Sequence, residues 1–208
     1  MKILNLYAGI GGNRKLWGDD HKIVAIEYDQ ATADVYKSLF PDDTVIVADA
    51  HEYLLHNYMN FDFIWASPPC PTHSDIRRCG VHAGQYEALY PDMSLYQTII
   101  LLKNFAPKDC KFVVENVKPY YEALIAPDVV IHRHYYWCNF KIHPFQVQDE
   151  RKHSDITGYG EVYGFDLKDT AILDKRKALR NMVDPDLGLH ILNCAGNYQA
   201  PVNYGLFA

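Results

Sequence analysis

The sequence predicts an α/β fold in which a mostly parallel sheet is covered by helices on both faces. Over the first 140 residues, short β-type runs alternate with helical ones, and strands separated by helices imply parallel pairing. An apolar content of 49% with 22% charged residues is typical of a soluble globular domain. No apolar run is long enough to span a bilayer. We therefore expect a single domain of ordinary size and no contact with a membrane.

Each expected element follows from the spacing of its apolar residues. Strands are expected at Ile3–Tyr7, Lys22–Tyr28, Thr44–Ala48, Phe61–Ala66 and Lys111–Val117, with one or two more within Val129–Phe140. Helices are expected at Asn13–Trp17, Gln30–Phe40, His51–Tyr58, Ser94–Phe105 and Leu173–Val183. Residues 71–91 are expected to form a long loop, and a loop of that length inside a compact domain usually has a function.

Cysteine content and net charge indicate the cellular compartment and limit the kinds of binding partner. Five cysteines without a repeated frame indicate reduced thiols in a cytoplasm, and the N-terminus leads into a strand without a signal-peptide layout. A net charge of −6 counts against a protein that coats nucleic acid non-specifically, because phosphate neutralisation needs clustered cations. Local basic runs occur at Arg77-Arg78, Arg151-Lys152 and Lys175-Arg176-Lys177 with Arg180. Taken singly, each run is more typical of a solvated surface.

A cofactor pocket is expected after the first strand. The run from Asn5 to Gly12 is a strand that leads into a glycine turn, where backbone can approach a ligand closely. Glu27 ends the second expected strand, in position to accept from ribose hydroxyls, and Asp49 ends the third. The turn is shorter than a dinucleotide fingerprint, so a nucleoside cofactor without phosphates fits better, and S-adenosylmethionine is the obvious choice. Surface carboxylates at strand ends are the alternative interpretation.

A thiol and a carboxyl group are expected at neighbouring strand ends. Cys70 follows Pro68 and Pro69, which fix φ and hold the chain extended where the fourth strand leaves the sheet. Glu115 emerges from a Val-rich strand, where a carboxyl is costly to bury without a partner. A thiolate and an acid facing one cleft suit attack on an electron-poor ring whose nitrogen the acid protonates. A small buried cysteine and a structural Glu–Arg pair are the alternatives.

These motifs together resemble the DNA (cytosine-5)-methyltransferases. Leu6–Gly12 resembles the family's first motif, Pro68-Pro69-Cys70 its nucleophile motif and Glu115-Asn116-Val117 its Glu-Asn-Val motif. Gly196-Asn197 resembles the final motif, and the matched segments span about residues 3 to 200 in the family's order. The resemblance implies a Rossmann-like S-adenosylmethionine-dependent methyltransferase fold.

The resemblance also implies a mechanism on double-stranded DNA. The target cytosine is flipped from the duplex. Cys70 adds to C6 of the ring while Glu115 stabilises the protonated N3, and Arg133 orients the cytosine carbonyl or its phosphate. C5 then takes the methyl group of S-adenosylmethionine, and loss of the C5 proton and of the thiol releases 5-methylcytosine.

Further site residues are implied by the same resemblance. The cofactor contacts are Tyr7, Ala8, Gly9, Gly11, Glu27, Tyr28, Asp49, Pro69 and Asn197. Aromatic rings at 7 and 28 would pack on the adenosyl group, and Asn197 would line the methionine end. The DNA contacts are Ser74, Arg77, Arg78 and Asn116. The 71–91 loop would close over the DNA, which gives it a function.

The sequence departs from the family at several positions. Pro71 replaces a Gln, Asn13 replaces an aromatic residue, and the eighth motif keeps Arg133 but has Tyr135 in place of its second arginine. Residues 1–140 would form the catalytic core, 141–174 a reduced target-recognition region, and 175–208 a segment that returns to the core. A short recognition region predicts limited base readout, and leaves open a partner protein that supplies DNA contacts. Such a compact form fits a bacteriophage or mobile-element origin.

Three other interpretations remain open. The pattern Cys70-x2-His73 with Cys79-x2-His82 suggests zinc, but the pairs are closer than in most small zinc modules, so no metal is expected. Ser67-Pro68-Pro69-Cys70 also resembles the motif of exocyclic-amino (N4-cytosine) methyltransferases, with Cys70 in place of the aromatic residue. A catalytically degenerate methyltransferase that serves as a DNA-binding or scaffold protein is the alternative from another class.

Overall fold

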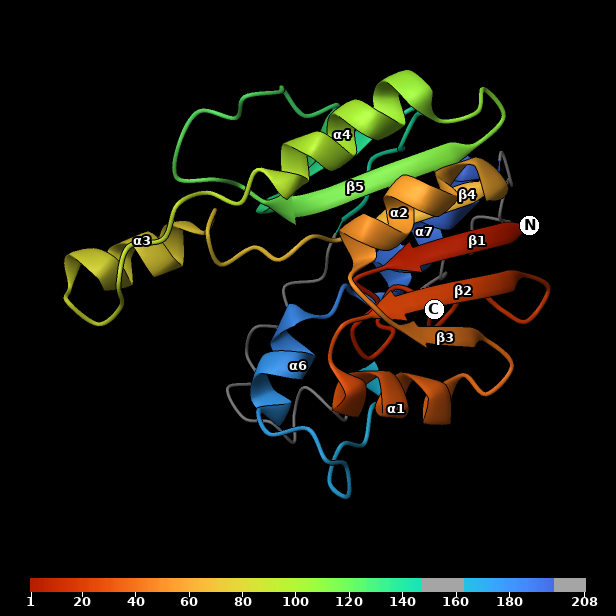
Figure 1. Cartoon of the computed structure of the whole chain (residues 1–208), viewed down its shortest axis with the longest axis horizontal. Helices are drawn as coiled ribbons and strands as arrows, with labels where there is room; N and C mark the ends of the chain where they lie inside the picture. The colour runs from red at the N-terminus through yellow and green to blue at the C-terminus, as the bar shows by residue number, and fades with distance from the viewer. Residues whose placement is uncertain (147–162, 197–208) are drawn as a thin grey trace, which may run out of the picture.

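A computed structural model describes residues 1–146 and 163–196, and it contains one seven-stranded sheet (Figure 1). The strands are β1 (Lys2–Leu6), β2 (Lys22–Glu27), β3 (Thr44–Val47), β4 (Phe63–Ala66), β5 (Lys111–Val117), β6 (Val129–Ile131) and β7 (His134–Cys138). Their order across the sheet is β3-β2-β1-β4-β5-β7-β6. The first five strands pair in parallel, and β7 is antiparallel to both β5 and β6. The predicted mostly parallel sheet is confirmed.

Helices cover both faces of this sheet. They are α1 (Gln30–Leu39), α2 (Ala50–Asn57), α3 (Asp75–His82), α4 (Ser94–Phe105), α6 (Lys175–Asn181) and α7 (Pro185–Ala195), with a short 3₁₀ helix η1 (Tyr58–Asn60). In Figure 1, α2 and α4 lie in front of the sheet and α7 behind it, while α3 projects away from the body. None of the helices in the described residues is long and apolar enough to cross a membrane.

The alternation of side chains along each strand produces two separate cores. Leu4 and Leu6 of β1 pack in a cluster with α2 and α4, whereas Ile3 packs on the opposite face with Trp65 and α7. Because successive strand residues point to opposite faces, every central strand is buried on both sides. This is why these strands appear in the sequence as continuous apolar runs.

The connections bring both predicted motifs to one edge of the sheet. From β1 the chain continues to β2 and β3 on one side of the sheet, whereas β5 follows β4 on the other. At such a switch point the carboxyl ends of neighbouring parallel strands border a crevice where α/β proteins bind ligands. The glycine turn follows β1 and the Pro-Pro-Cys turn follows β4, and these two strands are hydrogen-bonded neighbours.

The expected helix at Asn13–Trp17 is wrong. The chain there forms consecutive turns, in which the Lys15 amide donates to the Gly12 carbonyl at 3.3 Å. The cause is burial of two polar side chains that bond outside the segment. Asn13 pairs with Asn5 of β1, and Arg14 forms a buried ion pair with Asp43 at 2.8 Å. These tertiary contacts override the local helical spacing.

Two helices lie where none was expected. Helix α3 lies inside the region 71–91 that was predicted to be a loop, and α7 follows α6 directly. Gly188 weakens the helical pattern of α7, but its lack of a side chain is required, because an added carbon would lie 2.5 Å from the Asn13 carbonyl oxygen. The side chain of Asp184 caps this helix by accepting from the Leu187 amide at 3.0 Å.

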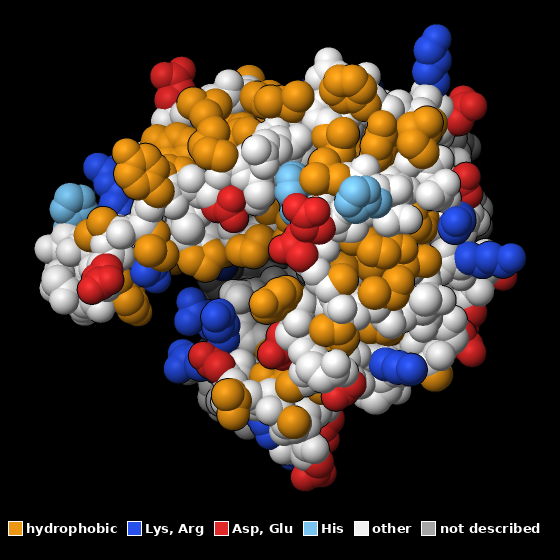
Figure 2. Space-filling view, viewed as in Figure 1, with side chains coloured by type: hydrophobic (Ala, Val, Ile, Leu, Met, Phe, Trp, Pro, Cys, Tyr) orange, Lys and Arg blue, Asp and Glu red, His pale blue; other side chains and the backbone are white. Residues whose placement is uncertain are grey.

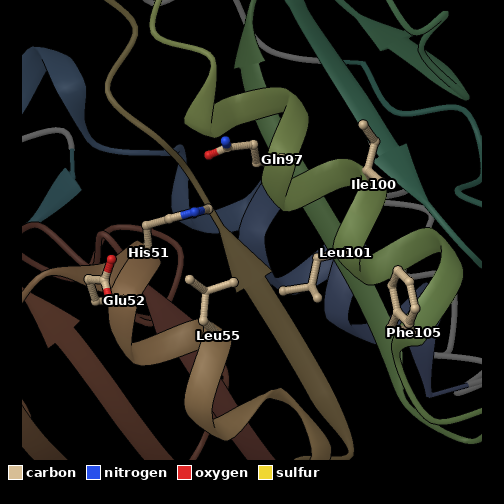
Figure 3. Close-up of a pocket in the computed structure, with 7 residues that line it drawn as sticks. All are labelled: His51, Glu52, Leu55, Gln97, Ile100, Leu101 and Phe105. Atoms are coloured by element: carbon tan, nitrogen blue, oxygen red, sulfur yellow. The ribbon is translucent and has the colours of Figure 1, made fainter.

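A shallow groove lies between α2 and α4, away from the carboxyl ends of β4 and β5 (Figure 3). It is lined by His51, Glu52, Leu55, Gln97, Ile100, Leu101 and Phe105. None of these residues belongs to the motifs that the sequence singled out.

Candidate active site

The glycine turn after β1 is held open by a carboxylate. Gly9 has φ +56°, a left-handed conformation that favours glycine, and its amide donates to Oε2 of Glu27 at 2.9 Å. A side-chain carbon added at Gly9 would meet no atom within 4 Å, so this position faces open space. At Gly11, with φ +85°, an added carbon would lie 2.3 Å from the Phe40 ring. Gly9 therefore borders a free volume, whereas Gly11 serves close packing.

The other expected cofactor residues surround this turn. Tyr7 has φ +56°, which is unusual for a side chain of this size, and its pKa is raised first by burial and then by Asp49 and Asp92. Tyr7 and Asp49 therefore lie at the same edge of the sheet. Tyr28 is 78% exposed, so its ring is available to a ligand.

The two acidic side chains also make structural contacts. Glu27 accepts from the Asp29 amide through Oε1 at 3.0 Å, in addition to its bond with Gly9. Asp49 accepts from the Glu52 amide at 2.8 Å and so caps α2. Ala8 is buried and Pro69 is exposed, while Asn197 lies outside the described residues.

The turn after β4 is fixed by backbone hydrogen bonds on both sides of the thiol. The buried Pro68 carbonyl accepts from the Asn116 side chain at 2.9 Å. The Cys70 carbonyl accepts from the His73 and Ser74 amides, each at 3.0 Å. Cys70 itself is half-buried, and its thiol is free like those of the other four cysteines. The turn thus presents one sulfur at the rim of the sheet.

Glu115 is on the neighbouring strand, within electrostatic range of this thiol. β4 and β5 are paired through Ala66 and Val114, and the Glu115 residue is only 9% exposed. The pKa of Cys70 is raised by burial first and by the Glu115 charge second, while Arg133 and Lys177 act in the opposite direction. The structure therefore brings the thiol, the carboxylate and two cations within electrostatic range of one another.

His134 also contacts Glu115, and sequence reasoning missed it. The β5–β7 register sets Glu115 opposite Tyr136, so His134, two residues earlier on β7, shares its face of the sheet. Its Nε2 lies 3.5 Å from Oε1 of Glu115. Burial lowers the pKa of His134, with Glu115 opposing, so the ring is neutral at pH 7. The sequence carried no signal for this contact, because it depends on the register of β7 against β5.

The residues expected to contact DNA have different environments in the structure. Ser74 precedes α3 and forms an isolated β-bridge with Pro119. Arg77 and Arg78 of α3 donate to the carbonyls of Glu87 and Tyr120 at 3.3 and 3.1 Å.

Asn116 differs most from the expectation of a DNA contact. It is 2% exposed, and its amide nitrogen faces Pro68 instead of the surface. The structure therefore gives this side chain a positioning role at the Pro-Pro-Cys turn, because a buried amide already bonded to backbone is withdrawn from solvent.

The described part of the chain contains no arrangement of side chains that supports zinc binding. Cys79 and His82 lie on α3, and His73 is buried with its Nδ1 at 2.5 Å from the Tyr121 hydroxyl. Among residues 1–146 and 163–196, no three His, Cys, Asp or Glu side chains converge as metal ligands do.

Comparison with known proteins assigns the family. The family described as C-5 cytosine-specific DNA methylase matches residues 1–122, more than half of the chain. The chain belongs to this family. The comparison with curated proteins found no match to this chain. The match contains the glycine turn, the Pro-Pro-Cys turn and Glu115, and with the sheet topology it establishes the Rossmann-like methyltransferase fold.

Solved structures show limited similarity. A triple mutant of DNMT2 from Spodoptera frugiperda is 25% identical, with a TM-score of 0.41 over 59% of this chain and 37% of that one. The methyltransferase EhMeth from Entamoeba histolytica is 16% identical, with a TM-score of 0.46 over 76% of this chain and 59% of that one. A SAM-dependent methyltransferase from Agrobacterium tumefaciens is 13% identical, with a TM-score of 0.43 over 58% and 40%. The chain thus spans less than two thirds of each of these proteins.

The side chain of Asn13, one of the departures from the family pattern, is accommodated by pairing with Asn5. Asn13 stands where an aromatic residue is usual, and it is buried at 4% exposure. Its side chain donates to Asn5 at 2.8 Å and accepts from it at 3.3 Å. Because each amide satisfies the other, the pair replaces an apolar contact without leaving a buried polar group unpaired.

Proposed function

We propose that this chain is a DNA (cytosine-5)-methyltransferase that takes its methyl group from S-adenosylmethionine. The observation that carries the proposal is the placement of Cys70 and Glu115 on neighbouring strand ends, next to the glycine turn. A nucleophile and a proton donor at one edge of the sheet match a reaction that adds to a pyrimidine ring and needs a ring nitrogen protonated.

The residues around the glycine turn fit the cofactor. Free space at Gly9 admits a ligand against the backbone, and Glu27 keeps unused lone pairs for ribose hydroxyls after accepting two amide bonds. The exposed Tyr28 ring offers a face to the adenine, whose amino group Asp49 would accept from. S-adenosylmethionine, when bound, supplies a methyl group made electrophilic by its sulfonium sulfur.

The chain's own residues would carry the ring chemistry. Cys70, as thiolate, forms a bond to C6 of the flipped cytosine, and the electron pair of the C5–C6 bond moves through the ring to N3, which Glu115 protonates. The resulting enamine is nucleophilic at C5 and accepts the methyl group. A base then removes the C5 proton, the C6–S bond breaks so that Cys70 leaves as thiolate, and N3 returns its proton to Glu115. Arg133, whose charge acts on the thiol, favours its ionised form.

The proposed DNA-recognition region lies partly outside the described residues. Double-stranded DNA is the proposed substrate, and the region 141–174 is proposed as a reduced recognition region, of which the structure describes residues 141–146 and 163–174. A protein partner that supplies further DNA contacts is part of this proposal.

Nucleoside analysis tests the proposed reaction. Purified protein is incubated with labelled S-adenosylmethionine and cytosine-rich duplex DNA, and the DNA is digested to nucleosides. We expect label in 5-methylcytosine. Label in N4-methylcytosine would support the amino-methyltransferase interpretation, and DNA binding without any label in varied duplexes would support a degenerate scaffold. The same assay with RNA defines the substrate class.

We predict that His134 positions Glu115. In the tautomer with its proton on Nε2, the neutral ring faces the carboxylate at 3.5 Å, and a polar contact of that length contributes about 1 kcal/mol. His134→Ala should therefore lower kcat by about 5-fold. The KM values for DNA and cofactor should stay unchanged, because the ring acts through Glu115.

Two further variants separate positioning from structural damage. His134→Gln retains an N–H donor and should recover most of the lost kcat, while His56→Gln, an exposed position on α2, should behave like the native protein. Equal loss of kcat in His134→Gln and His134→Ala would contradict the positioning role.

A further inference from the structure

Helix α6 is anchored next to the glycine turn. Its buried residue Leu179 packs in a cluster with Ile10, which follows β1, and with Val35 of α1. Immediately after α6, the Val183 carbonyl approaches Gly12 so closely that a side-chain carbon there would lie 2.4 Å away. The position of α6 is therefore set by the same turn that borders the proposed cofactor site.

The exposed side of α6 is strongly basic. Four of the six residues from 175 to 180 are Lys or Arg, in a chain whose net charge is −6. Figure 2 shows Lys and Arg side chains over α6 on one side of a hollow, with the projecting α3 segment on the other side. Lys177 and Arg180 are exposed, and within the described residues neither forms an ion pair.

The basic residues of α3, by contrast, are already engaged within the protein. Arg77 lies over the Tyr86 ring and Arg78 over the Tyr120 ring, at 5.1 and 5.2 Å from the ring centroids. Both also donate to backbone carbonyls. Stacked and hydrogen-bonded guanidinium groups hold a segment in place. Of these two helices, α6 is therefore the one with exposed cations, Lys177 and Arg180, that form no ion pair among the described residues.

Lys177 also acts on the nucleophile. Burial and Glu115 raise the pKa of Cys70, and Lys177 is one of the two cations that lower it. Lys177 is therefore within electrostatic range of the thiol, so that a polyanion bound along α6 would lie near the turn that carries Cys70.

We infer that α6 is a phosphate-binding wall of the nucleic-acid cleft, in which Lys177 and Arg180 contact the backbone of the duplex whose cytosine enters the site. The inference rests on the proposed function and names part of its substrate surface. Such contacts carry no base information, because phosphates are the same along every sequence. Their role is to hold the duplex against an otherwise acidic protein, which fits a chain with little room for base readout.

The salt dependence of DNA binding tests this inference. Affinity for a cytosine-containing duplex of 30 base pairs is measured between about 50 and 200 mM KCl for the full chain and for Lys177→Ala/Arg180→Ala. Each phosphate contact contributes about 0.9 to the slope of log K against log salt, so the double variant should be shallower by about 1.8. Lys177→Gln/Arg180→Gln should give the same change, and thermal unfolding checks that both variants fold.

The matched control removes two exposed lysines elsewhere. Lys37→Ala/Lys108→Ala carries the same net charge as the α6 variant and should keep the native slope. A native slope in the α6 variant, an equal decrease in the control, or a native chain that does not bind the duplex would overturn the inference. Failure of the proposed function is a different result, namely salt-dependent binding through α6 without methyl transfer to cytosine.

Discussion

Replacing Cys70 by serine is expected to abolish methyl transfer to DNA. A hydroxyl is far less ionised and less nucleophilic than a thiol, so addition to C6 should fail and kcat should fall by on the order of 10⁴-fold or more. Cofactor binding should be nearly unchanged, because the thiol acts on the base and the proposed cofactor contacts lie around the glycine turn. Methyl incorporation and cofactor titration on the same preparation measure the two effects.

The matched control is Cys194→Ser on α7. Cys194 is half-buried like Cys70 but belongs to the core on the other face of the sheet, so its replacement should leave activity near the native value. Retained activity in Cys70→Ser would exclude the thiol as nucleophile.

The native rate should also rise as pH increases above neutrality, because the raised pKa of Cys70 leaves the thiol protonated at pH 7.

The second large effect is expected for Glu115→Gln. An amide keeps the size of the side chain but cannot deliver a proton to N3, and loss of a general acid costs about 10²- to 10⁴-fold in rate. Cofactor affinity should not change. Single-turnover methylation measures the step itself, separated from product release.

Glu122→Gln provides the control for this substitution. Glu122 is exposed and follows the same strand, so the identical chemical change at that position should have little effect. Equal rates for Glu115→Gln and the native chain would show that ring protonation does not depend on this carboxyl group.

The strands and their motifs were predictable because their signals are local. The apolar runs at β1, β4 and β5 reflect burial on both faces of the sheet, and a glycine turn and a Pro-Pro-Cys turn follow β1 and β4. Parallel strands in a doubly wound sheet bring such turns to one edge, so the placement of the two turns at one edge of the sheet could be predicted from strand order.

Features that depend on tertiary contacts were not predictable. The segment at Asn13–Trp17 has helical spacing, yet buried bonds from Asn13 and Arg14 hold it in turns. Gly188 weakens the pattern of α7, and only its contact with Asn13 explains why glycine is needed there. His134 became visible only through the antiparallel register of β7 against β5, because no sequence signal sets that register.

Covalent trapping on 5-fluorocytosine DNA tests the central claim most directly. Fluorine at C5 blocks the final proton loss, so the enzyme should remain bonded to the base after methyl transfer. We predict a denaturation-resistant protein–DNA complex that requires S-adenosylmethionine, with the adduct located by mass spectrometry on the peptide that contains Cys70. Absence of the complex with the native chain, or an adduct at another residue, would contradict the account.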